Sequence, residues 1–99
     1  MPKYAFQLYV TGQTPRSEAA IRDLQRICDE ALGGACEIEV IDVLARADLA
    51  DSAGVLATPT LIKQAPAPSS RIVGDLSDAR RVLATLGLAD VDEIDDGGY

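Results

Sequence analysis

The sequence of 99 residues contains no histidine and only two cysteines, Cys28 and Cys36. Without histidine, catalysis that depends on imidazole is excluded, including the Ser-His-Asp arrangement. The two thiols are too far apart for a Cys-x-x-Cys motif, and with no histidine we expect no zinc site, other metal or cofactor. No apolar run approaches the roughly 20 residues that a membrane span requires.

The sequence also lacks a basic surplus, since its formal net charge is −7. Five acidic residues and no basic ones lie in residues 88–99, whereas residues 1–87 carry nine basic and eleven acidic residues, a net charge of −2. Nucleic-acid binding needs a basic surface, so neither nucleic acid nor a membrane is expected as a partner. The first residues lack a secretory segment, and a cytoplasmic protein is expected.

The residues that are present indicate one folded domain. Hydrophobic residues make up 47% and charged residues 25% of the sequence, which is ordinary for a soluble globular protein. We expect a domain at residues 1–87, followed by a flexible acidic tail at 88–99 that aids solubility.

The first half of the chain has the pattern of a βαβ unit. Alternating apolar residues predict an inner strand at 3–10. Thr14 and Pro15 suit the start of a helix of about 17 residues, which Gly33 and Gly34 would end. A second strand is predicted at 36–44 and would pair in parallel with the first. Cys28 falls on the apolar stripe of the helix, where it would be a small buried hydrophobe.

The second half has weaker signals. A short helix is predicted at 46–53, with Leu49 and Ala53 facing inward, and Gly54 would interrupt it. Extended runs at 58–62 and 71–73 flank a linker or wide turn at 64–70, which suggests an antiparallel hairpin. Ser77 is the expected N-cap of a last helix that Gly87 stops. The predicted order is β-α-β-α-β-β-α, an α/β layout of the thioredoxin-like kind.

Three places in this layout are candidate functional sites. The turn at 11–16 has no thiol for redox chemistry, so it is either a capped structural turn or an anion site. Pro59 precedes the third strand, where thioredoxin-like domains often have a cis proline; it would begin a strand or act as a slow conformational gate. The charged residues of the second half form either a solvated face or a patch for an acidic protein partner; they are Lys63, Arg71, Arg80 and Arg81.

Several stretches occur together in an order and spacing that resemble the KaiB family of circadian clock proteins. These stretches, which span about residues 4–86, are Leu8-Tyr9-Val10 with Gly12 and Thr14-Pro15, Val40-Ile41-Asp42-Val43-Leu44, Leu56-Ala57-Thr58-Pro59-Thr60-Leu61, and Arg71-Ile72-Val73-Gly74-Asp75-Leu76-Ser77. The sensory domain of the clock kinase SasA is similar in layout, but the Gly-Asp-Leu-Ser stretch is more like KaiB.

The resemblance implies a non-enzymatic protein that binds the ATPase ring of KaiC and modulates its cycle, with KaiA as a further partner where it is present. It also implies a metamorphic chain with two folds. One is the thioredoxin-like form, and the other is a ground state of order β-α-β-β-α-α-β that self-associates as a dimer or tetramer. Alternatives are a stand-alone adaptor resembling the SasA sensory domain, a stress-response paralogue, and a thiol oxidoreductase, for which Cys28 and Cys36 are misplaced.

Matched positions imply where this chain would act. The family's partner surface corresponds to Tyr4, Glu37, Glu39 and Asp42. The family usually has alanine and lysine where this chain has Glu37 and Glu39, so the charge of the contact strand is reversed. Candidates for controlling a fold switch are Pro59, Thr85 and Gly87, because Thr85-Leu86-Gly87 replaces the family's Gly-Leu-Asp at the end of the last helix.

Overall fold

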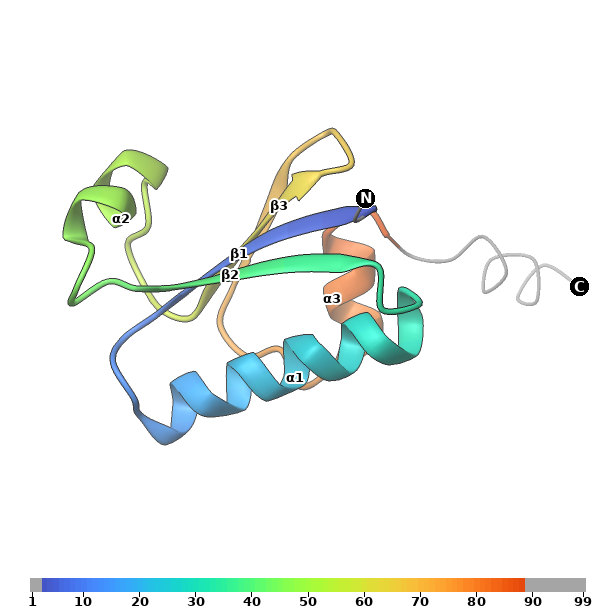
Figure 1. Cartoon of the computed structure of the whole chain (residues 1–99), viewed down its shortest axis with the longest axis horizontal. Coiled ribbons are helices and arrows are strands. Elements are labelled where there is room, and N and C mark those ends of the chain that lie inside the picture. The colour runs from blue at the N-terminus through green and yellow to red at the C-terminus, as the bar shows by residue number, and fades with distance from the viewer. Residues whose placement is uncertain (1–2, 89–99) are drawn as a thin grey trace, which may run out of the picture.

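A computed structural model of the chain describes residues 3–88. Its elements follow the predicted order β-α-β-α-β-β-α (Figure 1). Their bounds are β1 (Tyr4–Val10), α1 (Pro15–Ala31), β2 (Cys36–Asp42), α2 (Ala47–Ala53), β3 (Thr60–Ala65), β4 (Ser70–Val73) and α3 (Ala79–Thr85). The expected acidic tail lies outside the described residues, apart from Leu88.

The four strands form one sheet in the order β2-β1-β3-β4. β1 pairs with β2 in parallel, from Tyr4 opposite Cys36 to Val10 opposite Asp42, which confirms the predicted βαβ unit. β3 runs antiparallel to both β1 and β4, which confirms the hairpin. β1 is therefore an inner strand, and β2 and β4 are the two edges of the sheet.

The two faces of the sheet are covered unequally. Phe6, Leu8 and Val10 of β1 pack with apolar side chains of α1 and α3 in the main core. On the opposite face Tyr9 packs with Ala50 of α2 in a smaller cluster. Figure 1 shows α2 at one end of the molecule, away from α1 and α3. Among residues 3–88, no helix lies over the rest of that second face, toward the start of β1 and β2.

Helix α1 begins and ends as the sequence predicts. The Thr14 side chain accepts a hydrogen bond of 3.1 Å from the backbone N–H of Ser17, and Pro15 follows the cap. Gly33 has a φ of +67°, a left-handed conformation that glycine adopts without steric cost. The chain can therefore turn back sharply at this point toward β2.

The burial predicted for Cys28 is confirmed, since the residue is only 5% exposed, but its sulfur is not that of a free thiol. Cys28, near the end of α1, forms a disulfide with Cys36, the first residue of β2, and their Cα atoms are 6.2 Å apart. The turn after α1 brings the two residues together although eight positions separate them in the sequence. The bridge joins the end of the helix to the beginning of an edge strand.

Several predicted boundaries differ from the structure, most of them by one or two residues. β2 ends at Asp42 rather than at residue 44, and β3 continues through Ala65, so the turn of the hairpin is shorter than 64–70. The N-cap of α3 is Asp78, whose side chain accepts from the N–H of Arg81. Ser77 instead donates its hydroxyl and its backbone N–H to Asp75.

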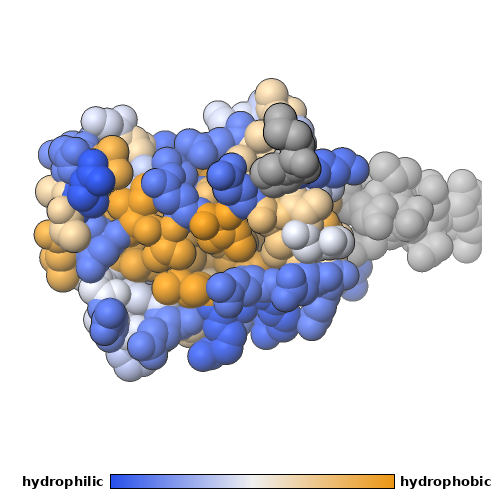
Figure 2. Space-filling view, viewed as in Figure 1, coloured by the Kyte–Doolittle hydropathy of each residue, from blue (hydrophilic) through white to orange (hydrophobic). Residues whose placement is uncertain are grey.

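The surface of the described residues is mixed in character. Figure 2 shows hydrophilic side chains over the part of the molecule that α1 occupies, and hydrophobic side chains gathered across the middle. Within residues 3–88, none of the helices has both the length and the apolar character that a membrane crossing needs.

An acidic sheet edge as the candidate functional site

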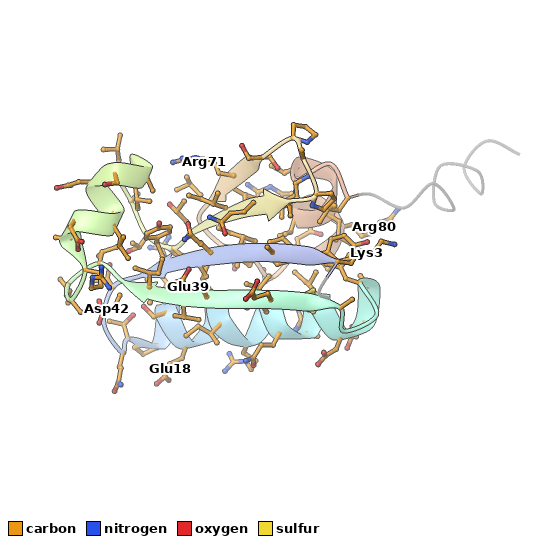
Figure 3. All side chains as sticks on the ribbon, turned by 45° about the horizontal axis from the view of Figure 1, so that its top comes forward. Lys3, Glu18, Glu39, Asp42, Arg71 and Arg80 are labelled. Atoms are coloured by element: carbon orange, nitrogen blue, oxygen red, sulfur yellow. A yellow bond between two sulfur atoms is a disulfide. The ribbon has the colours of Figure 1, made fainter. Side chains whose placement is uncertain are left out.

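Strand β2 presents an unpaired edge. It is hydrogen-bonded to β1 on one side only, because no other strand of residues 3–88 adjoins it. Glu37 and Glu39 are exposed, and the Val40 side chain on the other face of the strand is 43% exposed. Figure 3 places Glu39 and Asp42 along this strand, far from Arg80. An open strand edge is a ready surface for another chain to pair with.

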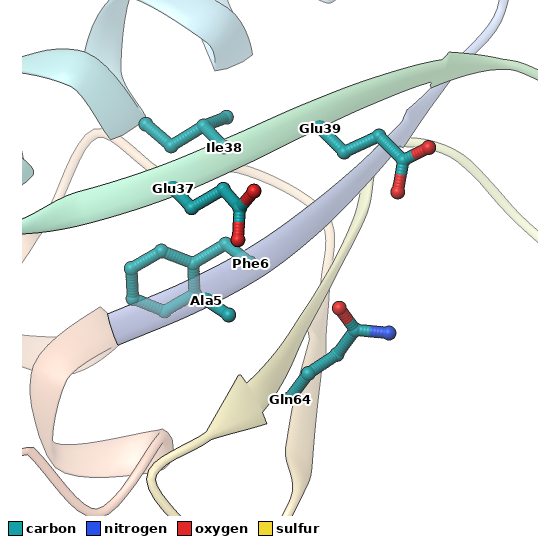
Figure 4. A pocket seen from close by; sticks show the side chains of 6 residues that line it. All are labelled: Ala5, Phe6, Glu37, Ile38, Glu39 and Gln64. Carbon is teal, nitrogen blue, oxygen red and sulfur yellow. The ribbon is translucent and has the colours of Figure 1, made fainter. Parts of the chain in front are cut away.

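The two glutamates border a hollow on the uncovered face of the sheet. Its volume is about 410 Å³, and Ala5 and Gln64 also line it. Figure 4 shows Glu37 and Glu39 projecting from β2, with the Gln64 side chain on β3 across the hollow. Within the described chain neither glutamate has a salt bridge. The hollow is therefore acidic and has no basic side chain paired to it.

A hydrogen-bond chain holds Glu39 in place. Gln7 of β1 donates its amide N–H to the Glu39 carboxylate at 3.1 Å, and the Tyr9 hydroxyl donates to the Gln7 carbonyl oxygen at 3.1 Å. Burial raises the pKa of Tyr9, and the negative charge of Glu39 raises it further. Sequence reasoning missed Gln7 as part of this surface, although the parallel pairing places it directly opposite Glu39.

Asp42 has a structural use at the end of the same strand. One of its carboxylate oxygens, Oδ1, accepts from the backbone N–H of Gly12 at 3.0 Å and from that of Leu44 at 2.9 Å. These bonds tie the end of β2 to the turn between β1 and α1. Asp42 thus shapes the sheet edge, and its carboxylate already has two partners within the chain.

Tyr4 lies apart from the acidic hollow. Its ring stacks on that of Phe6 with centroids 6.5 Å apart, and it packs against the main core on the helix-covered face. The four predicted partner residues lie along the β1–β2 pair, with Tyr4 at its start and Asp42 at its end, and they do not share one face. Glu37 and Glu39 form the open face, and Tyr4 borders the other.

The turn between β1 and α1 carries no thiol. The Thr14 cap is confirmed, and Ser17 donates its hydroxyl to the carbonyl oxygen of Thr11 at 3.1 Å. Thr11 and Thr58 share a hydrogen bond of 2.5 Å between their hydroxyl groups. The Thr58–Pro59 peptide bond is cis, and Pro59 is buried beside this turn. Where a redox enzyme would hold a nucleophile, this chain has a network of hydroxyl groups.

The remaining sequence-predicted residues are spread over the molecule. Thr85 and Gly87 lie at the exposed end of α3. The four basic residues of the second half do not form one patch, since Lys63 is only 2% exposed. Arg71 is bound to the end of α2, where it donates to the carbonyl oxygen of Ala53 at 2.7 Å.

No group of three or more Asp, Glu or Cys side chains that could hold a metal occurs within residues 3–88. The four-stranded sheet of the described chain, with its three helices, has a thioredoxin-like fold, and its first turn carries no thiol. The family model of the KaiB domain matches residues 7–88. The chain belongs to the KaiB family of circadian clock proteins.

Individual relatives are consistent with this assignment. The chain is 45% identical to the circadian clock protein KaiB3 of Synechocystis sp. over 88 residues, which cover 89% of this chain and 86% of the relative. It is 46% identical to the circadian clock oscillator protein KaiB of Acaryochloris marina over 94 residues, covering 95% and 89%.

Solved structures support the fold. The N-terminal domain of Synechococcus elongatus SasA aligns with a TM-score of 0.72 at 22% identity, over 91% of this chain and 89% of that one. Chloroplastic thioredoxin z aligns with a TM-score of 0.68 at 20% identity, over 87% and 77%. The thioredoxin-like fold predicted from the sequence is thereby confirmed.

Proposed function

We propose that this chain is a non-enzymatic clock component that binds a KaiC-type ATPase ring through the β2 edge and modulates its phosphorylation and ATPase cycle. The observation that carries the proposal is the unpaired β2 edge, where Glu37 and Glu39 are exposed without a salt bridge among residues 3–88. Membership of the KaiB family supports the choice of partner. KaiA, where present, and self-association as a dimer or tetramer belong to the same proposal.

The charge of the edge defines which ring this chain would accept. A partner surface that docks onto Glu37 and Glu39 must be basic or neutral, because like charges brought together at an interface cost several kcal/mol. The cognate ATPase should therefore carry basic residues at the matching position. A KaiC adapted to a lysine-bearing β2 would be repelled or bound weakly.

The test is binding to the cognate KaiC-type ATPase, measured by pull-down with ATP and with ADP after incubation for hours. The double substitution Glu37→Lys with Glu39→Lys should weaken binding by about tenfold or more. Glu18→Lys with Asp51→Lys changes the net charge equally at two exposed sites away from β2, and should leave binding unchanged. Absence of a complex in every nucleotide state would contradict the proposal.

A second candidate is a stand-alone adaptor module like the SasA sensory domain, which the structural similarity to that domain favours. Such a module would bind as a monomer without refolding. Binding kinetics distinguish the two: a slow phase independent of ATPase concentration indicates a fold switch, whereas a rate that rises in proportion to concentration indicates a preformed surface. A stress-response paralogue would show either behaviour with an ATPase from outside the clock.

A further inference from the structure

A second cavity lies on the other side of the molecule from the β2 edge, between the β3–β4 turn and the end of α3. Its volume is about 280 Å³. We call it the hairpin pocket; the lining residues used below are Lys63, Pro66, Pro68, Ser70, Thr85 and Gly87. Its size fits a small molecule or a single side chain rather than a large cofactor.

Among residues 3–88, Lys63 is the single charged residue that lines the hairpin pocket. It lies within the sheet, opposite Phe6 on β1 and Ser70 on β4, and is only 2% exposed. Within residues 3–88 its ammonium group makes no hydrogen bond or ion pair. The stem of Lys63 is therefore covered by its neighbours, while its ammonium group reaches the pocket without a charged partner among the described residues, and an anionic ligand there would gain a charge-assisted hydrogen bond.

Gly87 faces the ammonium group of Lys63 and, as a glycine, places no side chain beside it. A Cβ atom placed on Gly87 would lie 3.9 Å from Lys63 Nζ. Any other residue there would partly fill the approach, and the φ of +71° at Gly87 also disfavours most side chains. Gly87 therefore leaves room beside Nζ that a side chain at this position would occupy.

The other lining groups indicate what that group is. Ser70 donates its hydroxyl proton to the carbonyl oxygen of Leu86 at 3.3 Å, so this hydroxyl does not donate to a ligand while that bond holds. Pro66 and Pro68 provide apolar walls. One cation beside apolar surface suits a ligand with one negative charge and a short apolar stem, whereas a polyphosphate would need several cations.

We propose that the hairpin pocket binds a carboxylate carried on a short apolar stem, with Lys63 as the residue that pairs with it. The site is separate from the β2 edge and does not depend on the proposed clock function. The carboxylate comes either from a free short-chain acid or from an acidic side chain of this chain beyond Leu88, where five acidic residues follow.

The sequence offers a clean probe, because Lys3 and Lys63 are the two lysines of the whole chain. Labelling lysine with ¹³C at Cε therefore gives one NMR reporter in the pocket and an exposed internal control. On titration of the full chain with sodium propionate, the Lys63 signal should shift and saturate, with half-saturation at about 1–10 mM. The Lys3 signal should shift no more with propionate than it does with sodium chloride. Neutral propionamide should shift neither the Lys63 nor the Lys3 signal.

A second arm distinguishes the sources. Exchanging the five acidic residues at 90, 92, 93, 95 and 96 for amides should leave the propionate response unchanged if the ligand is a free acid. If the chain's own carboxylate occupies the pocket, this exchange shifts the Lys63 signal before any propionate is added and strengthens the response.

Two pocket variants complete the test. Gly87→Asp supplies a carboxylate next to Nζ, on a residue type that tolerates the left-handed conformation better than most, and should abolish the propionate response while shifting the Lys63 signal. Thr60→Ser, buried on the same strand but outside the pocket, is the matched control. The proposal would be overturned if the Lys63 signal shifted with propionate no more than the Lys3 signal does, and if neither the amide exchange nor Gly87→Asp shifted it.

Discussion

At the scale of single residues, Asp42 has the clearest structural task. Its Oδ1 atom accepts from the N–H groups of Gly12 and Leu44, which belong to different segments. Asp42→Ala leaves both donors without this acceptor and should lower the free energy of unfolding by about 1–3 kcal/mol. Asp42→Asn retains an oxygen acceptor and should cost less. Urea unfolding measures both, and equal losses in the two variants would contradict this role.

The comparison of these two variants also bears on function. Asp42 was predicted as a partner residue from sequence, yet its carboxylate is engaged within the chain. If Asp42→Asn keeps the fold and keeps partner binding, then Asp42 serves the shape of the β2 edge. If binding is lost while stability is retained, then its charge contacts the partner directly.

Asp75 offers a test of pH dependence. Hydrogen bonds from the side chain of Ser77, and then from its backbone N–H, lower the pKa of Asp75. Because the folded pKa lies below the unfolded one, this stabilisation is present above about pH 4 and is lost as pH falls through the folded value. Ser77→Ala should raise the Asp75 pKa, as read by NMR titration. Ser52→Ala, at an exposed position of α2, should not change it.

At the scale of elements, the disulfide between α1 and β2 is the strongest single connection. It closes a loop of eight positions, for which the chain-entropy relation gives about 2.5 kcal/mol of stabilisation. Reducing the wild-type protein should lower the free energy of unfolding by roughly that amount. The double variant Cys28→Ser with Cys36→Ser should have the same free energy of unfolding as the reduced protein, and adding reductant should not change it. Equal stability of the oxidised and reduced wild-type protein would contradict the expectation.

The elements also show which signals in the sequence were sufficient to predict the structure and which were not. Helix α1 could be predicted because Thr14, Pro15 and Gly33 mark its ends and an apolar stripe runs between them. The disulfide could not be predicted, because the position of Cys28 on the apolar stripe already explains why it is buried. Cys36 comes close to Cys28 only through the turn that follows the helix. The cap of α3 was misplaced by one residue because Asp75 engages Ser77 and leaves Asp78 as the acceptor.

At the scale of the whole molecule, the sequence could not foretell which charges lie inside. Lys63 follows three buried residues on β3, and a charged residue in such a strand is usually exposed on an edge. Here β3 is paired on both sides, so the lysine stem is covered by its neighbours. The acidic face of β2 was easier to foresee, since Glu37 and Glu39 alternate with apolar residues and the parallel pairing preserves that alternation.

The uneven cover of the sheet also predicts uneven stability. The main core joins β1 with α1 and α3, whereas α2 buries chiefly Ala50, whose small side chain contributes little apolar area. We expect residues 46–57 to open locally before the rest of the described chain. Native-state hydrogen exchange in low urea should give these amides a smaller opening free energy than those of β1.

Arg71 holds residues 46–57 against the sheet through hydrogen bonds. It reaches from β4 to the end of α2 and donates to the carbonyl oxygens of Ala53 and Gly54, where the helix dipole also favours a positive charge. Arg71→Ala should lower the opening free energy of residues 46–57 by about 1 kcal/mol and leave β1 nearly unchanged. Arg22→Ala, an exposed arginine on α1, is the control and should change neither. If the amides of α2 instead exchange only by global unfolding, with the same opening free energy as those of β1, then the sheet and α2 form one cooperative unit. That result would contradict the prediction.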